Sequence, residues 1–310
     1  MEQLTQCLAC GSKNYEAFLQ TAAMMHERTS EKFNFDRCQD CGLVFLNPRV
    51  PATELGQFYT AAYLPYRAED AWGKYASFVK QDQRNIDTAR VKRVKQYHDL
   101  RRSSRVLDVG CGKPTFLSAL HNEIPAQLIG LDFSDEGWRD EPEAYPGIDL
   151  RKGEIADLHG EAPVDVITMW HYLEHDYQPQ MHLRQLLDIA HSETLLIVEV
   201  PNFDSYTRRK FGQHWAGYHT PRHTALYSPH NIDLLLKNSG WQVEQVLTYG
   251  TLDPYILHWM SRMEQQRIDW SASMESKFAG YVAGMLLNAP VYKLHKWFSL
   301  GFLTAVARPL

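Results

Sequence analysis

The feature that most constrains the fold of this chain is an alternation of short apolar runs with longer helix-like segments after about residue 100. Such alternation indicates βαβ units and a mainly parallel sheet, an α/β fold. Strands are expected at 105–109, 127–132, 147–151, 164–169, 194–200 and 241–247, with GFLTAVARP near the C-terminus as one more. A chain of 310 residues is long enough for this sheet and a smaller unit.

A glycine-rich turn follows the first of these strands, in the segment LDVGCGKPTF. Gly110 and Gly112 can adopt backbone angles closed to other residues and let a ligand approach the main chain closely. Asp132 ends the next strand, where a carboxylate can accept hydrogen bonds from both hydroxyls of a ribose. The turn does not supply G-x-G-x-x-G, which argues against a dinucleotide. A glycine turn in a nucleotide-free α/β protein is the alternative.

Several motifs resemble, in the same order, those of class I S-adenosylmethionine-dependent methyltransferases: D-x-G-x-G after the first strand, an acidic end to the second, and DVITMWHYLEH at the fourth. The chain is similar, more narrowly, to the bacterial branch with a cysteine-rich N-terminal knuckle, an RCxxCGLVFLNPR-like exit and a PN…W.G…PRH segment. The resemblance covers about residues 7–250 and the last strand. It implies an enzyme with a seven-stranded Rossmann-like methyltransferase sheet, an antiparallel last strand and S-adenosylmethionine as cofactor.

Carried over position by position, the resemblance assigns nine residues to the cofactor, from its methionine end through the ribose to the adenine: Asp108, Gly110, Gly112, Asp132, Phe133, Glu154, Ile155, Trp170 and His171. In this set Asp132 would bind the ribose and Phe133 would pack on the adenine. The chain has Pro114 where the family usually has a third glycine. The first turn of a helix tolerates proline, because its missing N–H would be unpaired anyway.

Two C-x-x-C pairs lie near the N-terminus, and 27 residues separate them: Cys7, Cys10, Cys38 and Cys41. Four thiolates at this spacing suit tetrahedral zinc, with each pair on one side of the ion. The sequence therefore predicts a structural zinc site in a small domain of residues 1–50. Redox-active dithiols or free thiols are the alternative, although no thioredoxin-like pattern surrounds either pair. For the fifth cysteine, Cys111, packing inside the glycine turn is expected.

Histidines are concentrated in the second half of the chain, where residues 171–230 hold eight of the 14. The fourth and fifth strands are neighbours in this fold, so these side chains should meet at the carboxyl edge of the sheet, over the cofactor's methyl group. The candidate catalytic residues there are Glu174, His175, His219 and His223. Three roles stay open for them: a general base, for which imidazole has a suitable pKa, a metal site that includes Glu174, or structural hydrogen bonding.

Two further segments complete the expected domain organisation. Residues 51–103 are helical and rich in aromatic side chains, and they would form a lid or linker, with ordinary packing against the sheet as an equal alternative. Residues 104–310 would form the cofactor-binding domain, with a helical insertion at 254–298. That insertion mixes small and large apolar residues with a few lysines. Core packing or self-association is favoured for it over contact with a membrane surface.

Net charge and the lack of visible targeting signals limit the classes of function and the location that remain. A net charge of −5 argues against general nucleic-acid binding. No signal-like N-terminal segment and no run of 18 apolar residues is visible, so a cytoplasmic protein is expected. The expected function is methyl transfer to a small-molecule, glycan-precursor or lipid-precursor acceptor. A non-catalytic cofactor-binding or zinc-mediated interaction protein on the same fold is the alternative, and the oligomeric state is left open.

Overall fold

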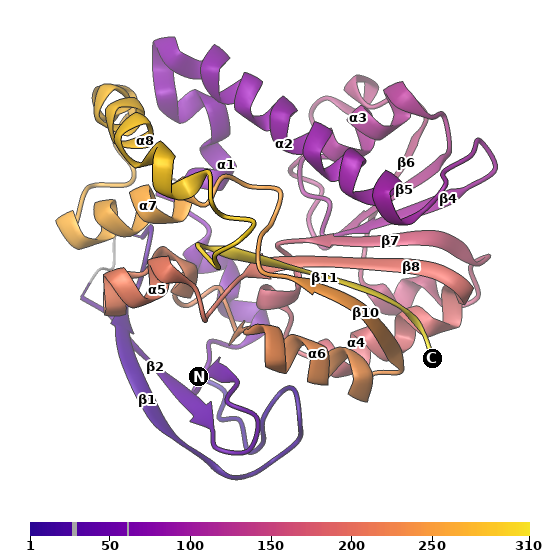
Figure 1. The fold of residues 1–310 in the computed structure, drawn as a ribbon, viewed down its shortest axis with the longest axis horizontal. Coiled ribbons are helices and arrows are strands. Elements are labelled where there is room, and N and C mark those ends of the chain that lie inside the picture. The colour runs from indigo at the N-terminus through magenta and orange to yellow at the C-terminus, as the bar shows by residue number, and fades with distance from the viewer. Residues whose placement is uncertain (27–29, 61) are drawn as a thin grey trace.

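A seven-stranded sheet forms the main body of the computed structural model, which describes residues 1–26, 30–60 and 62–310 (Figure 1). Its strands stand in the order β10-β11-β8-β7-β4-β5-β6. Their bounds are β4 (Arg105–Val109), β5 (Gln127–Asp132), β6 (Ile148–Lys152), β7 (Val164–Trp170), β8 (Ala190–Pro201), β10 (Trp241–Leu247) and β11 (Phe302–Pro309). Only β11 runs against its neighbours β8 and β10, so the predicted α/β sheet with an antiparallel last strand is confirmed.

The longest strand, β8, begins four residues earlier than the sequence predicts. Ala190 pairs with Val164 at the start of β7, and this pairing draws the polar residues 191–193 into the strand. From Thr194 onward β8 is completely buried, as expected for a strand in the middle of a sheet that helices cover on both faces.

Helices cover both faces of the main sheet, and each face has its own core (Figure 1). On one face lie α2 (Ala76–Tyr97) and α3 (Thr115–Glu123), whose Val94 and Leu117 pack with Val106. On the other lie α4 (Pro179–Gln185) and α6 (Pro229–Asn238), which pack against the neighbouring Leu107. The alternation of side chains along β4 therefore serves both cores.

A second, four-stranded antiparallel sheet contains the N-terminal residues. It runs in the order β1 (Tyr15–Ala22), β2 (Lys32–Cys38), β3 (Val44–Leu46) and β9 (Ala225–Leu226). The first two strands form an antiparallel hairpin between the cysteine pairs. The fourth strand comes from the segment after the PRH motif, where Phe45 pairs with Ala225. The N-terminal residues are thus joined by backbone hydrogen bonds to the second half of the chain.

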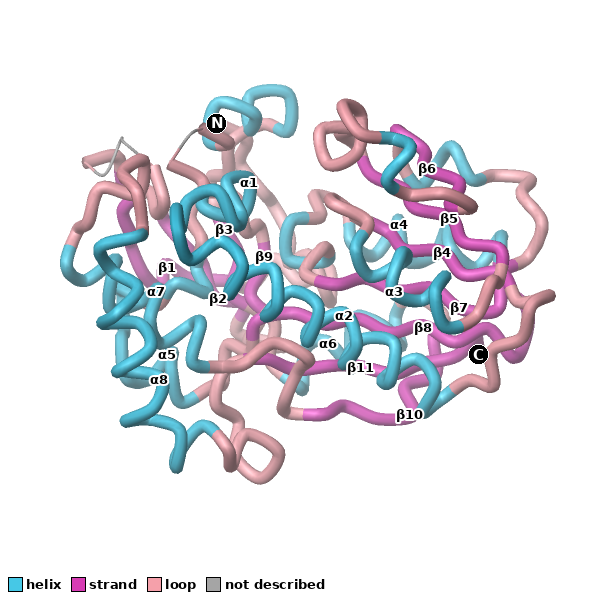
Figure 2. Tube along the Cα trace, turned by 90° about the horizontal axis from the view of Figure 1, so that it is seen from above, coloured by secondary structure: helices cyan, strands magenta, loops and turns pink. Residues whose placement is uncertain are grey.

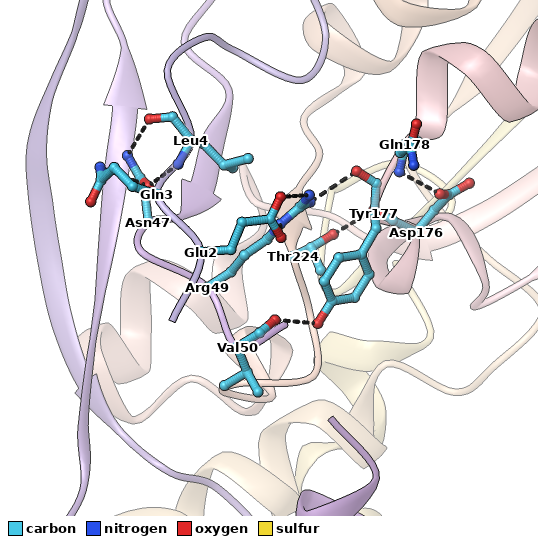
Figure 3. A network of polar contacts seen from close by, with 10 residues as sticks. All are labelled: Glu2, Gln3, Leu4, Asn47, Arg49, Val50, Asp176, Tyr177, Gln178 and Thr224. Carbon is cyan, nitrogen blue, oxygen red and sulfur yellow. Dashed lines mark hydrogen bonds and ion pairs between the residues drawn. The ribbon is translucent and has the colours of Figure 1, made fainter. Parts of the chain in front are cut away.

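Arg49 forms a further connection between these regions (Figure 3). Its guanidinium donates to both carboxylate oxygens of Glu2, at 2.9 and 3.0 Å, and to the Tyr177 carbonyl at 2.9 Å. The Tyr177 hydroxyl in turn donates to the Val50 carbonyl at 2.7 Å. These bonds hold the N-terminal residues against the loop that follows Glu174 and His175.

The remaining helices gather with the second sheet at one end of the main sheet (Figure 2). They are α1 (Leu64–Arg67), α5 (Tyr206–Phe211), α7 (Tyr255–Gln266) and α8 (Phe278–Tyr292), so the predicted insertion at 254–298 is helical. Short 3-10 helices connect these elements: η1 (Ala52–Phe58), η2 (Ala68–Tyr75), η3 (Pro142–Ala144), η4 (Ile155–Leu158), η5 (Leu173–His175), η6 (Leu186–Ile189), η7 (Gly212–His214), η8 (Ala216–Tyr218) and η9 (Glu275–Lys277). Among the described residues, no helix is long and apolar enough to cross a membrane.

Candidate active site

The glycine turn joins the carboxyl ends of β4 and β5. The Gly110 N–H donates to the Leu131 carbonyl at 2.7 Å, and the Gly112 N–H donates to Asp132 Oδ2 at 2.9 Å. Asp132 Oδ1 accepts from the Ser134 N–H at 3.0 Å. A carboxylate has about four acceptor positions, so Asp132 keeps capacity for the hydroxyls of a ribose.

The two glycines of the turn are required for different reasons. Both have positive φ, +72° at Gly110 and +49° at Gly112. A Cβ on Gly110 would lie 2.4 Å from the ring of Tyr172, which packs directly on the turn. A Cβ on Gly112 would meet no described atom within 4 Å. The surface beside Gly112 is thus open, which suits close approach of a cofactor to the main chain.

Asp108, just before the turn, is buried and bonded to the neighbouring strand. Thr168 Oγ1 donates to its Oδ1 at 2.6 Å. Burial raises the pKa of Asp108 to about 7, and the bond from Thr168 opposes that rise. The Asp108 carboxyl group therefore lies close to the glycine turn. A charge that binds beside it would shift its pKa and so change its protonation.

The other residues assigned to the cofactor lie at the ends of the neighbouring strands. The ring of Phe133, directly after Asp132, is 63% exposed and uncovered. Glu154 is exposed and caps η4, whereas the side chain of Ile155 is buried in the core, which leaves its backbone as the part that can face a ligand. Trp170 ends β7, and its indole Nε1 is buried without a hydrogen-bond partner.

A cavity of about 1030 Å³ lies beside the turn and brings together the two predicted sets of histidines. One wall consists of the residues after β7 and the PRH segment: Trp170, His171, Glu174, His175, His219 and His223. The opposite walls come from α2, α7 and the first turns of α8. His214, in the same sequence segment as His219, does not line the cavity.

Two of these histidines form a hydrogen-bonded chain of defined direction. His223 Nδ1 lies 2.8 Å from the Gly217 carbonyl and must carry the proton of that bond. His223 Nε2 is then an acceptor, so the proton of the 3.3 Å contact with His219 belongs to His219 Nδ1. This leaves His219 Nε2 with a lone pair, and that buried atom has no hydrogen-bond partner within the part of the chain that the structure describes. Burial lowers the pKa of both rings well below 6.5, which keeps both neutral.

His171 has a different environment, between two buried carboxylates. Its Nδ1 lies 3.3 Å from Glu174 and its Nε2 lies 3.3 Å from Glu199. Burial by itself lowers the pKa of His171, but the contacts with the two carboxylates outweigh burial and raise that pKa to about 9. His171 is therefore an imidazolium at neutral pH, and it compensates the charges of Glu174 and Glu199.

Glu174 and His175 complete the wall. Glu174 is 2% exposed and, apart from the ion pair with His171, neither of its oxygens has a hydrogen-bond partner among the described residues. Glu174, His175 and His223 offer ligand atoms within 4.8 Å of one another, a spacing that a metal ion could use. His223 Nε2, however, already accepts a hydrogen bond from His219.

Three polar side chains of α2 also line the cavity, and the sequence analysis missed them. Asp87 is 3% exposed and accepts from Gln83 Nε2 at 3.0 Å, and Gln83 also reaches Thr115 at the start of α3. The Arg90 guanidinium lies over the Trp170 ring at 5.2 Å. Their spacing of four and three residues places them on one face of a helix, which is the signal that could have identified them.

The four N-terminal cysteines gather into one cluster. The Cys7 and Cys41 sulfurs lie 3.5 Å apart, and those of Cys10 and Cys38 lie 3.6 Å apart. Tetrahedral zinc with Zn–S bonds of about 2.3 Å would separate its sulfurs by about 3.8 Å, whereas a disulfide requires about 2.05 Å. The cluster thus fits a zinc ion with four sulfur ligands. Cys111 is buried among apolar residues under the glycine turn, away from this cluster.

Comparison with known proteins agrees with this geometry. The profile of the family Methyltransf_23, described as a methyltransferase domain, matches residues 78–246. A protein of Mycolicibacterium smegmatis named "Probable S-adenosylmethionine-dependent methyltransferase" is 26% identical over 146 residues, which are 46% of this chain and 53% of the relative. The match thus spans about half the length of that curated relative.

Solved structures share the fold at low identity. A chain of the Haloferax volcanii complex that contains the Trm112 methyltransferase activator is 17% identical, with a TM-score of 0.51, over 78% of this chain and 97% of that one. The cyclopropane synthase MmaA2 of Mycobacterium tuberculosis is 13% identical, with a TM-score of 0.50, over 71% and 83%. The family match covers more than half of the chain. The protein therefore belongs to the methyltransferase-domain family, and its recognition from sequence as a class I S-adenosylmethionine-dependent methyltransferase is confirmed.

Proposed function

We propose that this protein transfers a methyl group from S-adenosylmethionine to a small-molecule, glycan-precursor or lipid-precursor acceptor, and that His219 is the general base. The observation that carries the proposal is that the cavity beside the glycine turn is lined by His219, whose buried Nε2 has no hydrogen-bond partner among the described residues. The fold class alone would not identify an acceptor or a base.

The cofactor would lie across the ends of β4, β5 and β7. Asp132 would accept hydrogen bonds from the ribose hydroxyls, the exposed Phe133 ring would cover the adenine, and Gly112 would let the methionine end approach the backbone. When bound, S-adenosylmethionine supplies a methyl group on a positively charged sulfur. Trp170 and Asp87, which line the cavity, and the buried Asp108 beside the turn would surround that charge.

His219 is suited to accept the acceptor's proton. Its ring is fixed by the hydrogen bond to His223, which is itself fixed by Gly217, so the lone pair has one orientation. The ring of Tyr63 packs beside it at 5.3 Å between centroids. General-base assistance of this kind contributes about 10²- to 10⁴-fold in rate, and orientation of the acceptor in an enclosed cavity adds to it.

Residues 51–103 would close the cavity as a lid. Trp72 packs against Trp259 of α7 and Tyr281 of α8, and Tyr75 stacks on Phe278 at 3.8 Å. In a closed lid these aromatic rings would exclude water from the cavity during transfer. Opening of this lid would admit the acceptor.

The cysteine cluster would hold a structural zinc ion within the domain of residues 1–50. With four sulfur ligands no position is left for substrate, so the ion would stabilise the fold without taking part in methyl transfer. Through β3 and Arg49 this domain supports the loop that carries Glu174 and His175.

Calorimetry with S-adenosylhomocysteine tests cofactor binding, and transfer of a labelled methyl group to a panel of hydroxylated small molecules, nucleotide sugars and isoprenoid phosphates tests activity. His219→Ala should retain cofactor binding and lose turnover. His214→Ala, a histidine of the same segment that does not line the cavity, is the matched control and should leave both unchanged.

The alternatives give other results. A metal site formed by Glu174, His175 and His223 would make turnover sensitive to a chelator at concentrations that leave the cysteine cluster loaded. Cofactor binding without turnover on every acceptor would favour the non-catalytic protein.

A further inference from the structure

The outward face of the C-terminal helical segment is almost entirely apolar. We call the exposed side chains of α8 and the turns after it the C-terminal apolar face: Leu286, Leu287, Val291, Leu294, Trp297 and Phe298. Leu287 is 82% exposed and Trp297 is 72% exposed. The face continues the helical spacing of three and four residues, so its members lie side by side. A contiguous apolar surface of this kind marks an interaction site.

The inward side of the same segment packs in an aromatic cluster with α7 and also forms polar contacts. The Tyr292 hydroxyl lies 2.6 Å from His258 Nδ1 of α7, and the Asn288 side chain donates to the Gly284 carbonyl at 2.7 Å. Tyr281 is buried against Trp259 and Tyr255. A helix at a water-exposed surface normally has polar residues outside, whereas α8 is apolar on both its inward and its outward side. The contacts of this helix with the rest of the chain are therefore satisfied without the C-terminal apolar face.

The charged side chains within this face are lysines. The chain as a whole is acidic, with a net charge of −5, yet no Asp or Glu follows Glu275. Lys293 and Lys296 lie within the face and are exposed. The Tyr206 N–H donates to the Ser299 carbonyl at 2.8 Å, which places the start of α5 beside the end of the face. The exposed Asp204 lies just before this helix, and the exposed Arg209 and Lys210 lie in its last turn.

We propose that the C-terminal apolar face docks on an anionic lipid bilayer. Leucine, tryptophan and phenylalanine side chains would enter the boundary between headgroups and acyl chains, and the lysines would extend to the lipid phosphates. A second copy of this chain fits less well, because a two-fold contact through this face would oppose Lys293 and Lys296 to the same lysines. Since no described helix can span a bilayer, the contact is one of surface binding.

Docking would also bring the cavity close to the bilayer. Phe278 and Tyr281, in the first turns of α8, line the cavity, while the later turns carry the C-terminal apolar face. An acceptor with a lipid tail could then reach the cavity while its tail stays in the membrane. The docking itself does not depend on methyl transfer, so its failure and that of the proposed function are distinguishable.

Co-sedimentation of the full chain with vesicles tests this proposal. We expect binding to vesicles of phosphatidylcholine with phosphatidylglycerol and much weaker binding to phosphatidylcholine alone. Leu287→Asp should abolish binding, and Lys293→Gln or Lys296→Gln should each lower the partition coefficient about fivefold. The matched controls are Met181→Ser, at an exposed apolar residue of α4, and Lys92→Gln, at an exposed lysine of α2, and both should bind as the unmodified chain does.

Three outcomes would overturn the proposal. The first is no binding to anionic vesicles by a chain that binds S-adenosylhomocysteine normally. The second is binding that Leu287→Asp leaves unchanged, which would place the contact elsewhere. The third is a dimer in light scattering that Leu287→Asp dissociates, which would identify a second copy as the occupant. Because Leu287 is 82% exposed, this variant should keep the thermal stability of the unmodified chain.

Discussion

Alanine at Gly112 should weaken cofactor binding at only a modest cost to the stability of the fold. A non-glycine residue at φ +49° costs about 1–2 kcal/mol in the free energy of unfolding. The new Cβ meets no described atom within 4 Å, so no packing cost is added in the free protein. In the complex the same methyl group would occupy space needed by the cofactor. An overlap of this kind costs about 1–3 kcal/mol, which is about a 5- to 150-fold loss of affinity.

Gly110→Ala provides the matched comparison two residues away. Its backbone cost is similar, with φ +72°, but its Cβ would lie 2.4 Å from the Tyr172 ring. Displacing that ring adds about 1–3 kcal/mol. The free energy of unfolding should therefore fall by about 2–5 kcal/mol in Gly110→Ala, clearly more than in Gly112→Ala.

Urea denaturation of the free proteins and calorimetric titration with S-adenosylhomocysteine measure the two quantities separately. We expect Gly112→Ala to lose only about 1–2 kcal/mol in the free energy of unfolding and to bind S-adenosylhomocysteine poorly. Normal affinity in Gly112→Ala would refute the placement of the cofactor against this turn. Equal destabilisation of the two variants would refute the close packing of Tyr172 on Gly110.

Three further predictions concern single groups. If His219 is the base, kcat/KM should stay level through neutral pH and fall only in acid well below pH 6.5, because burial lowers the pKa of His219 well below 6.5. A midpoint near 6.5 in the pH–rate profile would contradict this. The pKa of His171, raised to about 9 from its ordinary 6.5, stabilises the fold by about 3 kcal/mol below pH 6.5, and this contribution should be lost as pH rises through 9. Denaturation at several pH values should show this slope in the unmodified chain and not in His171→Gln. Removal of zinc by a chelator, or Cys41→Ser, should lower the unfolding temperature and expose thiols to alkylation, and a metal-free protein of unchanged stability would count against a structural ion.

The main sheet could be predicted because its strands are apolar runs bounded by polar helices. A strand that is buried on both faces is apolar at nearly every position, and the short segment VDVITMW of β7 shows this pattern. The cysteine cluster could also be predicted from short segments, because the two-residue spacing within each C-x-x-C pair suits two ligands of one metal ion. In both cases the information lies within a few residues of chain.

The finer features of the site depend on contacts that spacing does not encode. The orientation of the lone pair of His219 follows from a left-handed backbone at that residue and from the Gly217 carbonyl. The polar face of α2 was not identified, because Gln83, Asp87 and Arg90 also suit a solvent-exposed helix. For α8 the apolar content favoured packing or self-association, and only the structure shows that within one chain part of its apolar surface stays exposed.

The pairing of β3 with β9 has a consequence for folding during synthesis. The residues from Cys7 to Cys41 leave the ribosome early and can close around a metal ion as soon as Cys41 has emerged. The edge of β3 must then wait for Ala225, some 180 residues later, before its backbone groups find their partner. A contact of such sequence separation forms slowly, and an unpaired strand edge favours aggregation in the interval. An early metal ion would hold this edge in its final shape until β9 arrives, so metal supply during translation should affect the yield of folded protein.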